Sequence, residues 1–369
     1  MRFPEFSGEW AKTKLGDIGT TLIGLTYSPK DVVPSGGTIV LRSSNIKGGL
    51  TDYNDIVRVN KKIKESIITR VDDLLICARN GSARLIGKNA ILKQEDCGHT
   101  FGAFMMVYRA QNNKFVHQLL NTKRYYAQVG ENLGARINQI TTSDLNSFEF
   151  YFPQTLNEQN KVASMLSLLD ERIATQIKII EDLKKLKSAI RAKVFKQLES
   201  SCECWSEIGN MLQYEQPSKY LVTSTEYSDS YATPVLTANK AFILGYTDEE
   251  FGIYSKGECV IFDDFTMDVK FVNFPFKVKS SAIKILTANS SNDLYFVYEY
   301  LQNLGLVSEE HKRHYISEIE PMIVACPTFE EQQNISNLLR SFDSKIEYAN
   351  RELILYNKQK RYLLSQMFI

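Results

Sequence analysis

Residues 158–196, EQNKVASMLSLLDERIATQIKIIEDLKKLKSAIRAKVFK, and residues 331–369, EQQNISNLLRSFDSKIEYANRELILYNKQKRYLLSQMFI, decide the predicted fold of this 369-residue chain. Neither stretch contains Gly or Pro, the two residues that most often end a helix. An offset of 173 residues aligns them and brings Lys187 onto Lys360. The two stretches are therefore predicted to be copies of one long helix.

Apolar residues recur in both stretches at alternating steps of three and four. This repeat of 3.5 residues keeps one face of a helix turned toward a partner helix, so it predicts a coiled coil. At 1.5 Å per residue each helix would be about 60 Å long. The predicted coiled-coil seam consists of Leu166, Leu169, Ile173, Ile180, Leu183, Lys187, Leu339, Phe342, Ile346, Leu353, Tyr356 and Lys360.

Lys187 and Lys360 occupy equivalent positions in this seam, where an apolar residue is expected. In one interpretation both side chains extend along the flank of the coil and keep their charge in water. In the other they fix register and orientation, because they disfavour other pairings. An internal pair of helices is the simplest partner arrangement, and the pattern alone permits either direction.

Two globular regions flank the central helix. The first contains predicted strands at 38–41, 73–78, 104–108 and 148–152 and an amphipathic helix at 115–129. The second repeats this plan loosely. The pattern predicts an α+β fold that arose by tandem duplication, with two mixed α/β globular domains alternating with two long helices. The predicted boundaries are 1–152, 153–199, 200–327 and 328–369.

Charge is distributed unevenly along the chain, although the formal net charge is only +1. Residues 1–152 contain 20 Lys and Arg against 14 Asp and Glu, a net charge of +6. Residues 200–327 contain 9 against 18, a net charge of −9. The first globular domain is thus suited to a polyanion, and the second, taken alone, is not.

The compartment is predicted from the absence of targeting signals. No window approaches the run of about 18 apolar residues that crosses a membrane, and the N-terminus lacks an apolar signal core. The protein is expected in the cytoplasm.

Catalytic and metal-binding motifs are incomplete in this sequence. Residues 81–88 resemble a phosphate-binding loop but are one residue too long and continue with Asn89. Asp264 and Asp268 imitate part of a nuclease metal site, a spacing that is frequent by chance. The four histidines lack metal-ligand spacing, and two of them lie in residues 311–315, which are expected to form a solvated turn. We therefore predict no catalytic residue and no metal site.

Polar side chains that follow the predicted strands are the remaining candidates for function. Arg can pair with guanine and Asn or Gln with adenine, while Ser and Lys hold phosphates. Loops are rich in these residue types anyway, so each one alone is more often an ordinary exposed loop residue, and the set carries more weight than its members. The candidate DNA-binding residues are Arg42, Ser44, Asn45, Arg79, Asn80, Ser82, Arg84, Arg136, Asn138, Gln139, Thr237, Asn239, Lys240, Thr266, Lys279, Ser280, Lys312, Arg313 and Tyr315.

Several short motifs occur in a consistent order along the chain. They are FPEF at 3–6, DLL at 73–75 followed by RNGS at 79–82, and the exit from Phe152-Pro153 into Glu158-Gln159, which recurs at Pro327 and Glu331-Gln332. In these motifs and in its duplicated layout, the chain resembles the specificity subunit of type I restriction-modification enzymes.

The resemblance implies a subunit without chemistry of its own. Each globular domain would be a target recognition domain that binds one half of a bipartite, asymmetric site in double-stranded DNA. The two long helices would pair antiparallel, set the spacing between the half-sites and dock two modification (methyltransferase) subunits. No cofactor is expected in this chain; S-adenosylmethionine, ATP and Mg are expected in the modification and restriction subunits.

Two other classes of protein are compatible with parts of the sequence. A coiled-coil adaptor or scaffold would bind other proteins through its globular domains, and the acidic second domain favours it slightly. A free-standing methyltransferase would need a cofactor loop and a catalytic box, which the sequence lacks. Neighbouring modification and restriction genes would separate the first reading from the adaptor.

Overall fold

The structure is a computed structural model that describes residues 2–133, 138–237, 242–308 and 312–368. It divides into two compact units. Unit 1 comprises Met1–Gln176 and Glu352–Ile369, and unit 2 comprises Ile177–Arg351.

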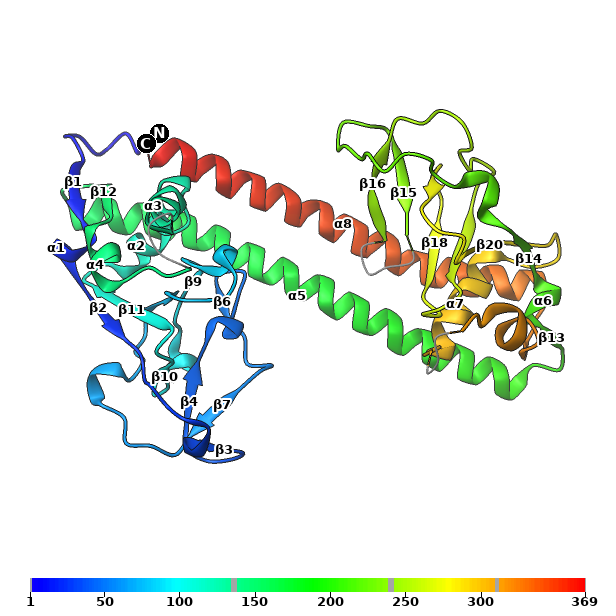
Figure 1. Ribbon diagram of the computed structural model, residues 1–369, viewed down its shortest axis with the longest axis horizontal. Helices are drawn as coiled ribbons and strands as arrows, with labels where there is room; N and C mark the ends of the chain where they lie inside the picture. Colours follow the sequence, from blue (N-terminus) through cyan, green and yellow to red (C-terminus); the bar gives the residue numbers. More distant parts are fainter. Residues whose placement is uncertain (1, 134–137, 238–241, 309–311, 369) are drawn as a thin grey trace. The chain divides into compact units, whose positions relative to one another are not determined.

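Two long helices, α5 (Leu156–Ser201) and α8 (Phe329–Met367), contribute to both units (Figure 1). They contain 46 and 39 residues. Each begins two residues before the stretch expected from the sequence, which starts at 158 or 331. All twelve residues of the predicted coiled-coil seam are buried or partly buried. The long apolar repeats thus form helices with one covered face, as their period requires.

Within unit 1 the two helices run in opposite directions. Lys360 of α8 pairs with Asp170 of α5 at 2.5 Å, and the Gln176 amide donates to Glu352 at 3.1 Å. The residue number rises along α5 while it falls along α8. In unit 2, Lys187 of α5 pairs with Asp343 of α8 at 2.6 Å. Each ion pair thus joins one seam lysine to an aspartate of the other helix.

Unit 1 contains two four-stranded sheets, with strand orders β2-β11-β8-β9 and β10-β4-β7-β3. The first sheet is antiparallel throughout, whereas β10 and β4 pair in parallel. The elements are β1 (Ala11–Lys14), α1 (Leu15–Ile18), β2 (Gly19–Ile23), η1 (Pro29–Asp31), β3 (Val32–Val33), β4 (Thr38–Leu41), η2 (Ser43–Asn45), β5 (Ile46–Lys47), β6 (Leu50–Thr51), β7 (Val57–Val59), η3 (Glu65–Ile67), β8 (Leu74–Cys77), η4 (Ala83–Leu85), β9 (Asn89–Ile91), η5 (Gln94–Asp96), β10 (Thr100–Phe101), β11 (Met105–Ala110), α2 (Asn113–Leu119), α3 (Lys123–Leu133), α4 (Thr142–Ser147) and β12 (Glu149–Phe152).

The core of unit 1 joins its first sheet to both long helices. Phe115 of α2 packs against Trp10 and against Phe368, with ring centroids 6.1 and 5.6 Å apart. Glu158 of α5 is buried and accepts hydrogen bonds from Arg2 and from the Trp10 indole. The chain start is therefore anchored on the first turn of α5, and Phe368, which follows α8, packs on α2 and on Trp10.

The helix predicted at 115–129 is wrong in one respect, because the structure divides it into α2 and α3. The break follows Leu119, and Thr122 begins the second helix by accepting a hydrogen bond from the amide of Tyr125 at 3.3 Å. A Thr side chain that satisfies a free amide is typical of a helix start. The apolar period continues across the break, which is why the sequence suggested one helix.

Unit 2 repeats the strand order of unit 1. Its main sheet, β14-β20-β17-β18, is antiparallel like β2-β11-β8-β9, and β15 pairs in parallel with β19 as β4 does with β10. The elements are β13 (Trp205–Glu207), α6 (Ile208–Met211), β14 (Leu212–Glu215), η6 (Pro217–Tyr220), β15 (Thr233–Leu236), β16 (Ile243–Thr247), β17 (Cys259–Asp263), β18 (Val269–Val272), β19 (Lys277–Val278), β20 (Ile283–Ala288), α7 (Leu294–Leu304), the π-helical turn η7 (Tyr315–Ile319) and β21 (Ile323–Ala325).

A charged cluster fixes α7 of unit 2 on the long helices. Glu299 of α7 is fully buried and pairs with Lys187 at 2.6 Å and with Arg191 at 3.3 Å, both on α5. Tyr295, one turn earlier on α7, donates to Asp343 of α8. Burial, followed by the hydrogen bond to Asp343, raises the pKa of Tyr295. The phenol therefore keeps its proton and remains a donor.

Candidate nucleic-acid interface

Polar loops that leave three strands of unit 1 meet at one edge. Ser43 follows β4, the segment 79–88 follows β8, and Phe104 precedes β11. Asn138 and Gln139 complete the group. We call this group the polar edge and define it as Ser43, Arg79, Asn80, Arg84, Lys88, Phe104, Asn138 and Gln139.

Backbone hydrogen bonds hold the centre of the polar edge. The amides of Ala78 and Arg79 both donate to the carbonyl of Phe104 at 3.0 Å. Arg79 also forms an antiparallel β-bridge with Gln139, and the amide of Ile140 donates to Ala78 at 2.9 Å. The loop after β8 is thus clamped between two other segments, and its side chains start from fixed positions.

Two asparagines bind the loops of the polar edge to each other. The Asn80 amide donates to the hydroxyl of Ser43 at 3.0 Å, and its oxygen accepts from the amide of Ser82. Asn138, which has a positive φ of 48°, donates to the carbonyl of Gly81 at 2.9 Å. Asn tolerates this left-handed conformation better than most residues. Both asparagines therefore shape the edge, and part of their bonding capacity is already used.

The cations of this region differ in how far they are committed. Arg79 and Arg84 are exposed. In the described parts of the chain, the only interaction found for either guanidinium is that of Arg79 with the Phe104 ring, 5.2 Å from its centroid. Arg42 instead pairs with Asp55 at 2.7 Å. A hydrogen bond from Ser44 and this ion pair lower the pKa of Asp55, so Arg42 stays partly neutralised.

Asn45 stabilises its loop from inside and is not part of the loop's surface. Its side chain is 1% exposed, donates to the carbonyls of Asp52 and Asp55, and accepts from the amide of Arg42. No part of the side chain faces outward to meet a base. We therefore leave Asn45 out of the interface proposed below.

The candidates of unit 2 lie on separate loops. Thr266, Lys279, Lys312 and Arg313 are exposed and Ser280 is partly exposed. Several are tied to neighbours, since Thr266 donates to Asp263 at 2.6 Å and the Lys312 ammonium pairs with Glu318 at 3.1 Å.

Two other candidates of unit 2 are buried. The expectation of a solvated turn at 311–315 is corrected in part: Lys312 and Arg313 are exposed, but His314 and Tyr315 are buried. Tyr315 is fully buried and packs against Phe262, with ring centroids 5.4 Å apart, and its neighbour His314 is buried too. Thr237 is also buried. The first turn of η7 packs on the sheet through the apolar ring of Tyr315, which the polar residues before it did not indicate. Tyr315 and Thr237 are left out of the proposed interface.

Three candidates, Arg136, Asn239 and Lys240, lie outside the described residues. The structure adds two residues that the sequence did not single out, Phe104 and Lys88. Phe104 is 60% exposed although it is a large aromatic residue at the start of a buried strand. An exposed aromatic side chain beside cations is frequent in binding surfaces. Only the structure shows that Phe104 is one.

Asp264, which imitated a metal ligand in the sequence, has a structural role. Its buried carboxylate accepts hydrogen bonds from the amides of His314 and Tyr315 at 3.0 and 2.9 Å and faces Lys284 at 3.3 Å. Across the described residues, no group of three or more His, Cys, Asp or Glu is placed to hold a metal ion. No helix of the described chain is long and apolar enough to cross a membrane.

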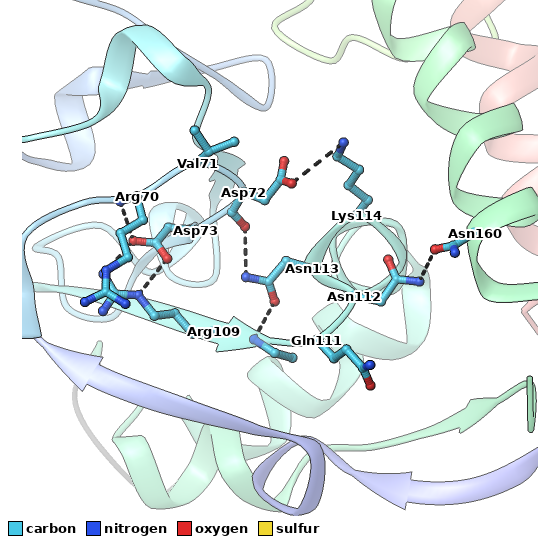
Figure 2. A pocket seen from close by; sticks show the side chains of 11 residues that line it. Arg70, Val71, Asp72, Asp73, Arg109, Gln111, Asn112, Asn113, Lys114 and Asn160 are labelled. Carbon is cyan, nitrogen blue, oxygen red and sulfur yellow. Dashed lines mark hydrogen bonds and ion pairs between the residues drawn. The ribbon is translucent and has the colours of Figure 1, made fainter. Parts of the chain in front are cut away.

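Apart from the polar edge, unit 1 has a polar hollow between β8, β11 and the start of α2 (Figure 2). Arg109 pairs with the buried Asp73 through two hydrogen bonds of 2.7 and 2.8 Å. The Asn113 amide donates to the carbonyl of Asp72, and Lys114 faces the Asp72 carboxylate at 3.7 Å. These groups pair with one another, so the hollow holds the strands and the helix together.

Comparison with known proteins finds a family model that matches the first half of the chain. Residues 7–185 match the family model described as Type I restriction modification DNA specificity domain. This stretch is similar to the DNA specificity domains of type I restriction-modification systems. The resemblance found in the sequence is thereby confirmed, and the polar edge lies within the matched specificity domain.

Two curated relatives are specificity subunits. That of the type I restriction enzyme EcoR124I/EcoR124II of Escherichia coli is 41% identical over 176 residues, which cover 44% of this chain and 44% of the relative. That of the enzyme StySPI of Salmonella potsdam is 24% identical over 200 residues, which cover 50% of this chain and 42% of the relative. The chain thus matches less than half of the length of either relative.

A solved structure extends the likeness beyond the specificity domain. The S subunit of the type I restriction-modification system from M. genitalium aligns with 100% of this chain and 99% of its own, with a TM-score of 0.65 and 16% identity. At this identity the likeness concerns the fold alone.

Proposed function

We propose that this chain is a sequence-specific DNA-binding subunit of a type I restriction-modification complex. Each globular domain would recognise one half of a bipartite, asymmetric site. The observation that carries the proposal is the polar edge, because it presents the uncommitted Arg79 on a rigid backbone within a type I DNA specificity domain. Arg on a rigid element is suited to base recognition, while mobile cations are suited to phosphates.

The tandem organisation is part of this proposal. We keep the boundaries 1–152, 153–199, 200–327 and 328–369 for the two target recognition domains and the two helices. The shared strand order of the main sheets of units 1 and 2 supports a duplication. The ion pairs Lys360–Asp170 and Lys187–Asp343, which are equivalent under the offset of 173, support an antiparallel coiled coil with internal two-fold symmetry.

The long helices are proposed to set the half-site spacing and to dock two modification subunits, to which restriction subunits would add. Leu168 and Ile179 of α5 and Leu338 of α8 are exposed, and burial of such side chains would stabilise an assembly. Met165 of α5 is not part of this exposed set, because it packs against the core of unit 1.

Chemistry is assigned to the partners in this proposal. The chain would bind no cofactor, and S-adenosylmethionine, ATP and Mg would be held by the modification and restriction subunits. The acidic charge of residues 200–327 means that unit 2 would attract phosphates weakly. Its affinity for DNA would depend on partner subunits that enclose the DNA.

The test is to co-express the chain with a modification subunit, determine the mass of the complex and map the methylated adenines by sequencing. One chain with two modification subunits, methylating a single split motif, is the expected result. A complex that forms but methylates without sequence preference would contradict DNA specificity. A chain that binds no modification subunit would favour the adaptor.

A further inference from the structure

Arg79 differs from the other cations of unit 1 in how its backbone is held. Its amide donates to Phe104, and its β-bridge with Gln139 fixes the residue from the other side. Arg84 lies in the short turn η4, five residues further along the loop. The starting point of the Arg79 side chain is therefore fixed by two other segments of unit 1, the one at Phe104 and the one at Gln139.

The guanidinium of Arg79 is also oriented by a contact that leaves its N–H donors available. It lies over the exposed ring of Phe104, at 5.2 Å from the centroid. A cation above an aromatic face is attracted by the ring and loses freedom of movement, yet it keeps its N–H donors. Arg42 and Lys88, by contrast, donate to Asp55 and to the carbonyl of Ser43.

The corresponding position of unit 2 holds a different residue. In unit 1 the amide of Arg79 donates to Phe104, just before β11; in unit 2 the amide of Asp264 donates to Ala282, just before β20, at 3.0 Å. Asp264 is buried and binds its own unit, and Ala282 has no ring to orient a cation. At this position unit 2 therefore lacks the stacked arginine that unit 1 has.

We propose that Arg79 recognises a guanine in the half-site bound by unit 1, and that Phe104 is a positioning residue that orients its guanidinium. Arg donates two parallel hydrogen bonds to O6 and N7 of guanine in the major groove, which no other base accepts in the same way. Free donors on a fixed backbone with a supporting ring are what such a contact requires. This inference rests on the proposed function.

The experiment uses the complex of the full chain with its modification subunits. Methylation is measured on a DNA library in which each base of both half-sites is varied. Arg79→Ala and Arg79→Lys are expected to reduce the preference for guanine at one position of one half-site by roughly 10- to 100-fold. The other positions and the other half-site keep their preferences.

Phe104 variants test the positioning role. Phe104→Ala is expected to lower the same preference, by roughly threefold to tenfold, because the guanidinium loses its support. Phe104→Tyr keeps the ring and is expected to restore the preference, which a loss of folding would not allow. Since the ring is 60% exposed, either substitution leaves the core of unit 1 intact.

Arg84→Ala provides a charge-matched comparison. We expect it to weaken binding equally for all library sequences and to reduce the salt slope of binding by about one, as for a phosphate contact. The same uniform loss for Arg79→Ala, or an unchanged guanine preference, would overturn the inference while leaving the proposed function intact. A wild-type complex without any sequence preference would refute both.

Discussion

Lys187→Met is a sharp test of how the long helices hold unit 2. The Lys187 ammonium is 13% exposed and lies 2.6 Å from both Glu299 and Asp343. Glu299 is fully buried, and removal of the lysine leaves Arg191, at 3.3 Å, as the remaining ion-pair partner of its carboxylate among the described residues. Breaking one side of a buried ion pair costs about 3–5 kcal/mol.

Arg191 remains as a partner, and we therefore expect the lower end of that range, about 3 kcal/mol. The equivalent Lys360→Met substitution in unit 1 is the matched control. Lys360 pairs with Asp170, which is 28% exposed, and water can take over part of the lost contact. Its expected cost is about 1 kcal/mol or less.

Hydrogen exchange is the suitable assay, because a chain with two units need not unfold in one step. In Lys187→Met, the amides of α7 are expected to exchange roughly 100-fold faster, which corresponds to about 3 kcal/mol. Adding Glu299→Gln removes the unpaired charge and is expected to restore at least about 1 kcal/mol. Equal effects of Lys187→Met and Lys360→Met, or no recovery in the double variant, would refute the reasoning.

Three further predictions concern the unfolding free energy of unit 1. Burial, aided by the Lys360 cation, lowers the pKa of His117 from 6.5 to about 4. As the pH falls, the unfolded chain therefore binds this proton before the folded chain does, and the unfolding free energy should decrease by about 3 kcal/mol from pH 6.5 to 4. The variant His117→Gln should lack this decrease. Gly24→Ala places a Cβ 2.2 Å from a backbone oxygen and should cost about 3 kcal/mol, whereas Gly81→Ala enters open space and should be neutral. Arg109→Met leaves a buried aspartate unpaired and should cost about 3 kcal/mol in urea unfolding.

The polar edge illustrates what local sequence could predict about the site. Arg79, Asn80 and Ser82 follow a buried strand, and strand ends are where binding loops begin. Phe104 could not be paired with Arg79 in advance, because the two are 25 residues apart and only strand pairing of β8 with β11 brings them together. Tyr315 looked solvated from its charged neighbours, but tertiary packing buries it.

The sequence by itself determined the two long helices and their covered faces. These follow from periodicity, which is a property of neighbouring residues and needs no knowledge of distant contacts. Only the tertiary structure decided the partners of the seam lysines and the stacked pair at the polar edge. Such contacts join residues far apart in the chain, and which of them form depends on strand register and on the burial of every neighbour at once.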